Sequence, residues 1–315
     1  MYRIWLFIAA LSIVFAACGT DEGATSSVPS TLTTASTATA DAAFPVTITT
    51  PTGDVTIEAM PERIVSLSAT ATESLFAIGA GGQLVAVDDV SNFPEGVPQT
   101  DLNGFTVTAE SLAVFDPDLV VYFFDPGDLA SGLAALDIPA IFQPAPVTLD
   151  EALVQIDQLG TATGRGVEAS TLTSQMQKDI DAIYEAADGA ASATYYYELD
   201  ETLFSVTSST FVGGLFAPLG LENIADPADS DGFGYPQLSA EFIIAEDPGL
   251  IFLADTRCCG QNVETVGRRP GWDRLTAVRA GSIVELDDDV ASRWGPRIVE
   301  LLQTAADAVS RLQES

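Results

Sequence analysis

Two stretches of this chain repeat each other in the same order, and this internal echo constrains the fold more than any other feature of the sequence. The first echo pairs Ser68-Ala-Thr70 and Leu75-Phe-Ala77 with Ser208-Ser-Thr210 and Leu215-Phe-Ala217. The second pairs the Asp-Pro-containing segment that begins at Glu110 with the one that begins at Glu241. Two matches in register favour a duplicated unit over coincidence. The 315 residues are also enough for two units, each with its own core.

Strand and helix patterns alternate within each half. Arg63 to Ser68 and Gln83 to Asp88 have the pattern of strands, and Thr72 to Ile78 between them has the pattern of a helix that ends before Gly79. Leu119 to Phe124 is an almost wholly apolar strand. Because continuous apolar strands between helices indicate a parallel sheet that is covered on both faces, we predict an α/β fold of two Rossmann-like lobes with parallel central sheets.

A long helical segment separates the two halves. Thr148-Leu-Asp-Glu151 is a capping-box pattern that predicts a helix to about Thr163. A second helix from Val167 to about Ala187 carries apolar residues at helical spacing. We therefore predict an N-terminal lobe at 44–147, a helical connector at 148–188 and a C-terminal lobe at 189–315.

The N-terminus has the pattern of an export signal. Arg3 precedes an apolar run from Ile4 to Val14, and small residues lead directly to Cys18. This arrangement resembles a bacterial lipobox and predicts a signal peptide at 1–18, with Cys18 as the lipidated residue; an ordinary secretory signal that contains a cysteine is the alternative. Residues 19–43 are mostly Ser, Thr and Ala and predict a disordered tether. We expect an extracytoplasmic protein that a lipid anchors to the cell membrane.

Composition excludes several classes of function. The 45 acidic and 12 basic residues give a formal net charge of −33, which repels the phosphates of nucleic acids, so no nucleic acid is expected as a partner. The absence of histidine removes Ser-His-Asp catalysis and imidazole ligands for zinc or haem. A carboxylate-dependent hydrolase remains possible.

Two adjacent cysteines, Cys258 and Cys259, are all that remains for disulfide chemistry once Cys18 is set aside. They are too few for a disulfide framework, so the fold depends on its apolar cores. Outside the cytoplasm the sequence allows either a disulfide between these two neighbours or a disulfide from them to another chain.

Five motifs occur in the order of a known family. They are Pro61 to Glu73, Glu110 to Val120, Tyr235 to Glu241, Pro270 to Gly281 and Ser292 to Glu300. With them the chain resembles the periplasmic binding proteins for iron complexes and cobalamin, over essentially all of residues 44–312. The resemblance implies two lobes joined by one long helix, a ligand cleft between them, and delivery of the ligand to an ABC permease with its ATPase.

The same resemblance implies particular site residues. Glu73 and Glu241 match the exposed carboxylates, one on each lobe, that meet arginines of the permease. Phe93 and Tyr235 match aromatic positions on opposite sides of the cleft, where rings stack on planar or macrocyclic ligands. The lack of histidine points to a ligand that is already a chelate, a ferric siderophore or a cobalamin-like compound.

Arginines gather near the C-terminus, and some of them fall near the expected cleft. Arg257 follows the strand Leu250 to Leu253, and Arg293 lies in the last motif. Both are candidates to hold an anionic chelate, with a role in the surface ion pairs of the protein as the alternative. For Arg297 we predict a structural salt bridge that orders the last helix.

The sequence thus predicts a monomeric binding protein with no catalytic residues, no cofactor and no resident metal. Two alternatives remain. A secreted carboxylate-dependent hydrolase requires two carboxylates roughly 5–10 Å apart in a cleft. A surface binding protein without a transport role would use the same lobes for adhesion or sensing.

Overall fold

A computed structural model describes residues 43–125, 127–189 and 192–313, and all of them belong to one compact unit. The predicted signal peptide, Cys18 and all but the last residue of the predicted tether lie outside the described residues. The first described elements are β1 (Val46–Thr50) and β2 (Gly53–Ile57), which pair as an antiparallel hairpin.

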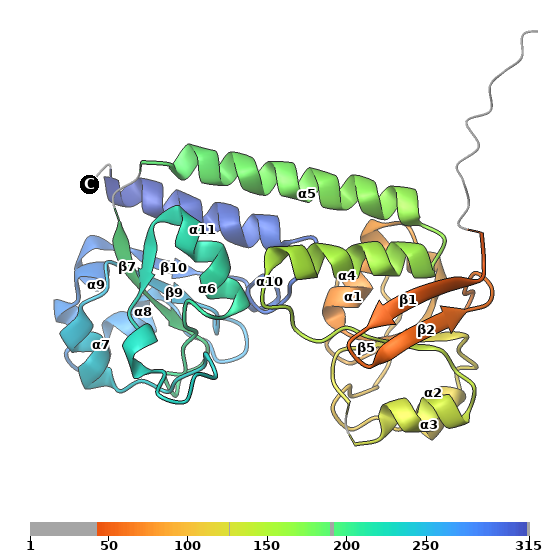
Figure 1. The fold of residues 1–315 in the computed structure, drawn as a ribbon. Coiled ribbons are helices and arrows are strands. Elements are labelled where there is room, and N and C mark those ends of the chain that lie inside the picture. Colours follow the sequence, from red (N-terminus) through yellow and green to blue (C-terminus); the bar gives the residue numbers. More distant parts are fainter. Residues whose placement is uncertain (1–42, 126, 190–191, 314–315) are drawn as a thin grey trace, which may run out of the picture. The chain divides into compact units, whose positions relative to one another are not determined.

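Two separate four-stranded parallel sheets confirm the predicted two-lobed α/β fold (Figure 1). The first has the order β4-β3-β5-β6, and the second has the order β10-β9-β7-β8. The strands of the first sheet are β3 (Ile64–Leu67), β4 (Leu84–Val87), β5 (Leu119–Tyr122) and β6 (Ala140–Phe142). Those of the second are β7 (Ala193–Glu198), β8 (Leu221–Asn223), β9 (Leu250–Leu253) and β10 (Ile283–Glu285).

Helices cover both sheets. Those of the N-terminal lobe are α1 (Ala69–Ala77), α2 (Ala109–Ala113) and α3 (Leu129–Ala135). Those of the C-terminal lobe are α6 (Phe211–Phe216), α7 (Ala240–Glu246), α8 (Val263–Gly267), α9 (Thr276–Ala280) and α10 (Asp288–Ala291). Short 3₁₀ turns lie at Gly81–Gln83, Ala217–Leu219, Asp226–Ala228 and Trp272–Arg274. All residues of β5 and β9 are buried, as the prediction of covered sheets requires.

The three long helices are α4 (Leu149–Ala162), α5 (Gly166–Ala187) and α11 (Ile298–Gln313), and α5 runs from the N-terminal lobe to the C-terminal lobe (Figure 1). The predicted capping box opens α4, because the Thr148 side chain accepts from the amide of Glu151 and Glu151 accepts from the amide of Thr148. Helix α4 packs against α1 and β1 of the N-terminal lobe, whereas α11 runs beside α5 (Figure 1). Within the described part of the chain, no helix combines the length and the apolar character needed to cross a bilayer.

One apolar core runs through both lobes and the three long helices. It contains Leu75 of the N-terminal lobe, Ile180 of α5, Phe252 of the C-terminal lobe and Leu302 of α11. Two further cores cover the opposite faces of the two sheets. Because a close-packed core resists deformation, this arrangement favours small movements of the lobes over a wide hinge opening.

Replacement of Ile180 by alanine is expected to lower the free energy of unfolding by about 2–5 kcal/mol, because this side chain is fully buried, at 0% exposure, in the shared core. Val167 lies in the same helix but is 55% exposed, and Val167→Ala should change that free energy by less than about 0.5 kcal/mol. Urea denaturation followed by circular dichroism measures both. Equal effects would contradict a shared core at α5.

Candidate ligand-binding cleft

A cavity lies where the strand ends of the N-terminal lobe meet the C-terminal lobe. Ser68, Val90 and Phe123 follow β3, β4 and β5, and all three line it. Asp289 and the segment 292–294, which follow β10, line the other side. The cavity has a volume of about 270 Å³. Loops at the carboxyl ends of parallel strands form the binding crevice of open α/β sheets, so this position is the candidate ligand site.

A buried ionic cluster lies next to this cavity and shares one lining residue, Arg293, with it. Glu73 of α1 is only 3% exposed, and its Oε1 accepts from Arg293 Nη1 at 2.6 Å and from Arg297 Nη2 at 2.7 Å. Its Oε2 accepts from Arg297 Nε at 2.9 Å. The Glu73 hydrogen bonds are the main cause that raises the pKa of Arg297 above its usual value. A carboxylate of the N-terminal lobe is therefore neutralised by two guanidinium groups from the C-terminal part of the chain.

The resemblance implied that Glu73 is exposed, and the structure shows that it is buried. The structure buries its carboxylate against Arg293, a residue that the sequence offered as a ligand contact. Arg297 forms the salt bridge that we predicted, and its partner is Glu73. Glu241 differs, since it is exposed in the first turn of α7. The two candidate docking carboxylates are thus in opposite environments.

The candidate arginines of the cleft are occupied by acidic partners. Arg293 Nη2 binds Asp289 Oδ1 at 2.7 Å and the carbonyl oxygen of Val90 at 2.9 Å. Arg257 Nη1 lies 2.7 Å from Asp289 Oδ2 and 3.4 Å from Asp287 Oδ2. Each positive charge is therefore compensated before a ligand arrives, which makes this part of the cleft a poor site for an anion.

Exposed aromatic rings lie on the strand-end loops of both lobes. Phe93 is 43% exposed, and the guanidinium carbon of Arg297 sits 4.3 Å from its ring centroid. On the other lobe, Tyr235 and Phe233 are 52% and 78% exposed, in the loop that leads from β8 to α7. Among the ring contacts of the described residues, none joins Phe93 to Tyr235. The rings are available on both sides, and the structure does not bring them together.

Sequence reasoning did not identify three further aromatic residues at these strand ends as candidate site residues. Phe105 lies with its ring centroid 5.4 Å from those of Phe123 and Phe124, and Phe105 and Phe124 are both well exposed. We predicted a strand through Phe124, but β5 ends at Tyr122, so Phe123 and Phe124 belong to the loop at the strand end. The sequence carried no signal for this end, because the neighbouring strand was predicted to be equally long, whereas β3 and β5 pair only over Ile64–Leu67 and Leu119–Tyr122.

Two buried acidic residues lie close together at the strand ends of the C-terminal lobe. Glu198 ends β7 and is bound at 2.6 Å through both carboxylate oxygens by Arg269. Asp255 follows β9, is fully buried, and has no hydrogen-bond partner for either side-chain oxygen among the described residues. Burial, with the adjacent charge of Glu198, raises the pKa of Asp255 from its usual 3.8 to about 7. Asp255 therefore holds its proton well above the range of an exposed carboxyl.

Two α/β lobes that face each other across a helical connection, with a cavity at their strand ends, define a two-lobed binding protein. A family model described as periplasmic binding protein matches residues 64–290. The chain therefore belongs to the periplasmic binding protein family.

Individual relatives cover most of the chain. A Bacillus subtilis protein, the uncharacterized ABC transporter substrate-binding lipoprotein YvrC, is 26% identical over 97% of this chain and 96% of its own. A cobalamin-binding protein of Halobacterium salinarum is 26% identical over 81% of this chain and 71% of its own. The crystal structure of the periplasmic vitamin B12 binding protein BtuF of Vibrio cholerae, at 23% identity, covers 81% of this chain and 99% of its own with a TM-score of 0.69, a likeness of fold.

Glu73→Gln is expected to lower the free energy of unfolding by about 3–5 kcal/mol, because it leaves the charges of Arg293 and Arg297 without their buried partner. Glu241→Gln is the matched control, and it should change that free energy by less than about 0.5 kcal/mol because Glu241 is exposed. Chemical denaturation of both variants measures the difference. A Glu73→Gln protein as stable as the wild type would show that the ionic cluster adds nothing to the fold.

Asp255→Asn is expected to stabilise the protein in a pH-dependent way. Between the usual pKa of 3.8 and about 7, folded Asp255 holds a proton that the unfolded chain has released, so the wild type loses stability as the pH rises through this window. The variant has no such titration. Its gain in melting temperature over the wild type should therefore be small near pH 4 and should grow up to about pH 7. A gain that is independent of pH would be inconsistent with a buried, protonated Asp255.

Proposed function

We propose that this protein captures a corrinoid, cobalamin or a close relative, in the cleft between its lobes and delivers it to an ABC permease with its ATPase. The observation that carries the proposal is the set of exposed rings on the strand-end loops of both lobes, above all Phe93 and Tyr235. Rings stack favourably on large planar ligands, and exposed rings on the strand-end loops of both lobes suit a macrocycle bound between the lobes.

The charges near the cavity support a ligand without net negative charge. Arg257 and Arg293 are paired with Asp287, Asp289 and Glu73, and the whole chain carries a net charge of −33. An anionic ferric catecholate would meet compensated arginines and a repulsive field. The same compensated arginines and negative net charge favour neutral or cationic chelates, so a ferric hydroxamate siderophore is the second candidate.

The relatives support the same ligand class and the same location. The Halobacterium salinarum relative is named for cobalamin, and the Bacillus subtilis relative is named as an ABC transporter substrate-binding lipoprotein. We propose that the chain is exported, that Cys18 carries the lipid anchor, and that residues 19–43 act as the tether between anchor and lobes. The lobes and connector are assigned to 44–147, 189–315 and 148–188, and the protein acts as a monomer.

Docking to the permease is proposed to use Glu241 directly. This carboxylate is exposed on α7 and open to arginines of a partner. Glu73 would dock only by exchanging Arg293 and Arg297 for arginines of the permease. Glu241→Lys is therefore expected to abolish uptake with ligand affinity intact, whereas Glu73→Lys should also reduce affinity, because it breaks the wall of the cleft.

The carboxylates described around the cleft do not favour the hydrolase alternative. Asp287 and Asp289 are partly exposed, but both are paired with Arg257. Glu198 and Asp255 are neighbours at the strand ends, but both are 0% exposed, and Arg269 occupies Glu198. A glycosidic oxygen would have no path to them without rearrangement of the loop above. The proposal therefore assigns the cleft to binding rather than to turnover.

Binding is tested by quenching of tryptophan fluorescence with cyanocobalamin, a ferric hydroxamate, a ferric catecholate and haem. Trp294 lines the cavity and Trp272 is buried in the C-terminal core, so a ligand in the cleft should quench Trp294. Saturable quenching by cyanocobalamin that Trp294→Phe removes is the expected result, with calorimetry as the independent check. Saturable quenching by the ferric hydroxamate alone would make the hydroxamate, not the corrinoid, the ligand. If none of the four compounds binds, the proposed ligand class is refuted.

The aromatic contribution is tested by Phe93→Ala and Tyr235→Ala. Each is expected to weaken cyanocobalamin binding by about tenfold through the lost stacking area. Val114→Ala is the control, because Val114 is 77% exposed and lies between α2 and the amino end of β5, at the opposite edge of the sheet from the strand-end loops. Calorimetric affinities that are equal for all three variants would exclude the rings from the binding site.

A further inference from the structure

The loop that follows β9, residues 254–262, carries a disulfide between two adjacent cysteines. Cys258 and Cys259 are bonded to each other, so the bridge between neighbours that the sequence left open is the one present. Cys258 is exposed and Cys259 is half-buried. We call residues 254–262 the disulfide loop. It directly follows β9, and so lies at the carboxyl end of a parallel strand, the edge at which open α/β sheets form their binding crevices.

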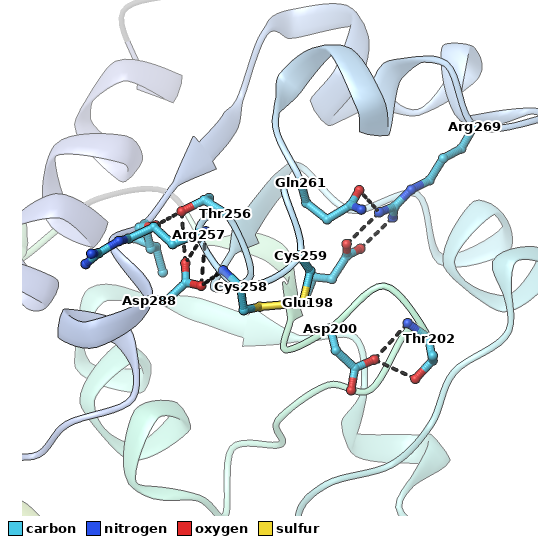
Figure 2. The surroundings of a disulfide bond; sticks show 11 residues. Glu198, Asp200, Thr202, Thr256, Arg257, Cys258, Cys259, Gln261, Arg269 and Asp288 are labelled. Carbon is cyan, nitrogen blue, oxygen red and sulfur yellow. Dashed lines mark hydrogen bonds and ion pairs between the residues drawn. A yellow bond between two sulfur atoms is a disulfide. The ribbon is translucent and has the colours of Figure 1, made fainter. Parts of the chain in front are cut away.

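Both ends of the disulfide loop are fixed to the C-terminal lobe, and the disulfide lies between the two attachments (Figure 2). On one side, Asp288 accepts from the amides of Arg257 and Cys258 at 3.0 and 2.7 Å. On the other side, Gln261 Oε1 accepts from Arg269 Nη2 at 2.7 Å, and Arg269 is held by Glu198. The disulfide is therefore carried by a loop that is anchored on both sides of it.

The disulfide loop is connected to the wall of the cleft by ion pairs. Arg257, next to Cys258, reaches Asp289, and Asp289 binds Arg293. Arg293 in turn binds Glu73 of the N-terminal lobe. Asp289 and Arg293 both line the cavity. Cys258 is thus the neighbour of Arg257, which begins an ion-pair network that reaches the cavity.

Stabilisation of the whole fold does not account for this disulfide. The stabilising effect of a disulfide on the unfolded chain grows with the number of residues in the loop that it closes. The two cysteines are one position apart, so their bond encloses no intervening residue. What the bond restrains is the local backbone of the disulfide loop, and its effect is expected at that place.

We propose, on the basis of the ligand capture proposed above, that the disulfide loop is a redox-sensitive part of the binding site. In the oxidised protein the restrained loop contacts the bound chelate. An external dithiol reduces it: two electrons and two protons pass to the sulfur pair, the S–S bond breaks to give two thiols, and the dithiol closes to its own disulfide. The freed backbone then no longer holds Arg257 and the sulfur surface in place, and the ligand is bound more weakly.

The test compares cyanocobalamin binding to oxidised protein and to protein reduced with dithiothreitol and freed of it without oxygen. Equilibrium dialysis should show a dissociation constant about tenfold larger after reduction. Cys258→Ser/Cys259→Ser should bind like the reduced protein and should not respond to dithiothreitol, which controls for other effects of the reagent. An oxidised and a reduced protein of equal affinity would overturn the proposal.

A second measurement separates this inference from the choice of ligand. Amide hydrogen exchange should become faster on reduction in residues 256–262 and stay unchanged in β7 and α5. If oxidised protein binds neither cyanocobalamin nor a ferric hydroxamate, the proposed function fails, while faster exchange confined to the loop still supports its redox response. Exchange that does not change on reduction would refute the redox-sensitive loop whatever the ligand.

Discussion

The cleft depends on one buried carboxylate, that of Glu73, which is shared by Arg293 and Arg297. A charge removed from water in this way is tolerated only with close, well-directed partners, and here the partners come from the other end of the chain. The ion pairs of Glu73 with Arg293 and Arg297 therefore fix α1 of the N-terminal lobe to the segment before α11. Asp289 extends the network to Arg257 and so to the rim of the C-terminal lobe.

Polar and apolar groups have different roles in this site. The ionic network and the shared core set the positions of the lobes, and the exposed rings on both rims offer the surface that a large ligand needs. Because the arginines are already compensated, selectivity is expected to come from shape, stacking and the absence of negative charge on the ligand. A largely formed cleft of this kind loses little conformational freedom when it binds.

Features that depend on neighbouring residues in the sequence were predictable. The capping box at Thr148 and the buried strand β5 are examples, because hydrogen bonds over three residues and apolar runs are visible in the sequence itself. The environment of Glu73 was not predictable, because its partner Arg293 lies 220 positions later and no local sequence pattern indicates that contact. The family motif suggested exposure, and tertiary packing decided otherwise. The aromatic cluster at Phe105 was missed because the strand ends two residues earlier than its apolar run.

The position of α11 has a consequence for the order in which this chain acquires its structure. The helix occupies Ile298–Gln313, and it packs along α5, which is made much earlier in synthesis. Arg293 and Arg297, which neutralise Glu73, also come late. Until this last segment emerges, the core of the connector stays open and Glu73 has no counter-charge. Contacts between distant parts of the chain form slowly. Completion of the fold is therefore coupled to the synthesis of α11 and of the segment before it, so the lobes can reach their final packing only after residues 293–313 have been made.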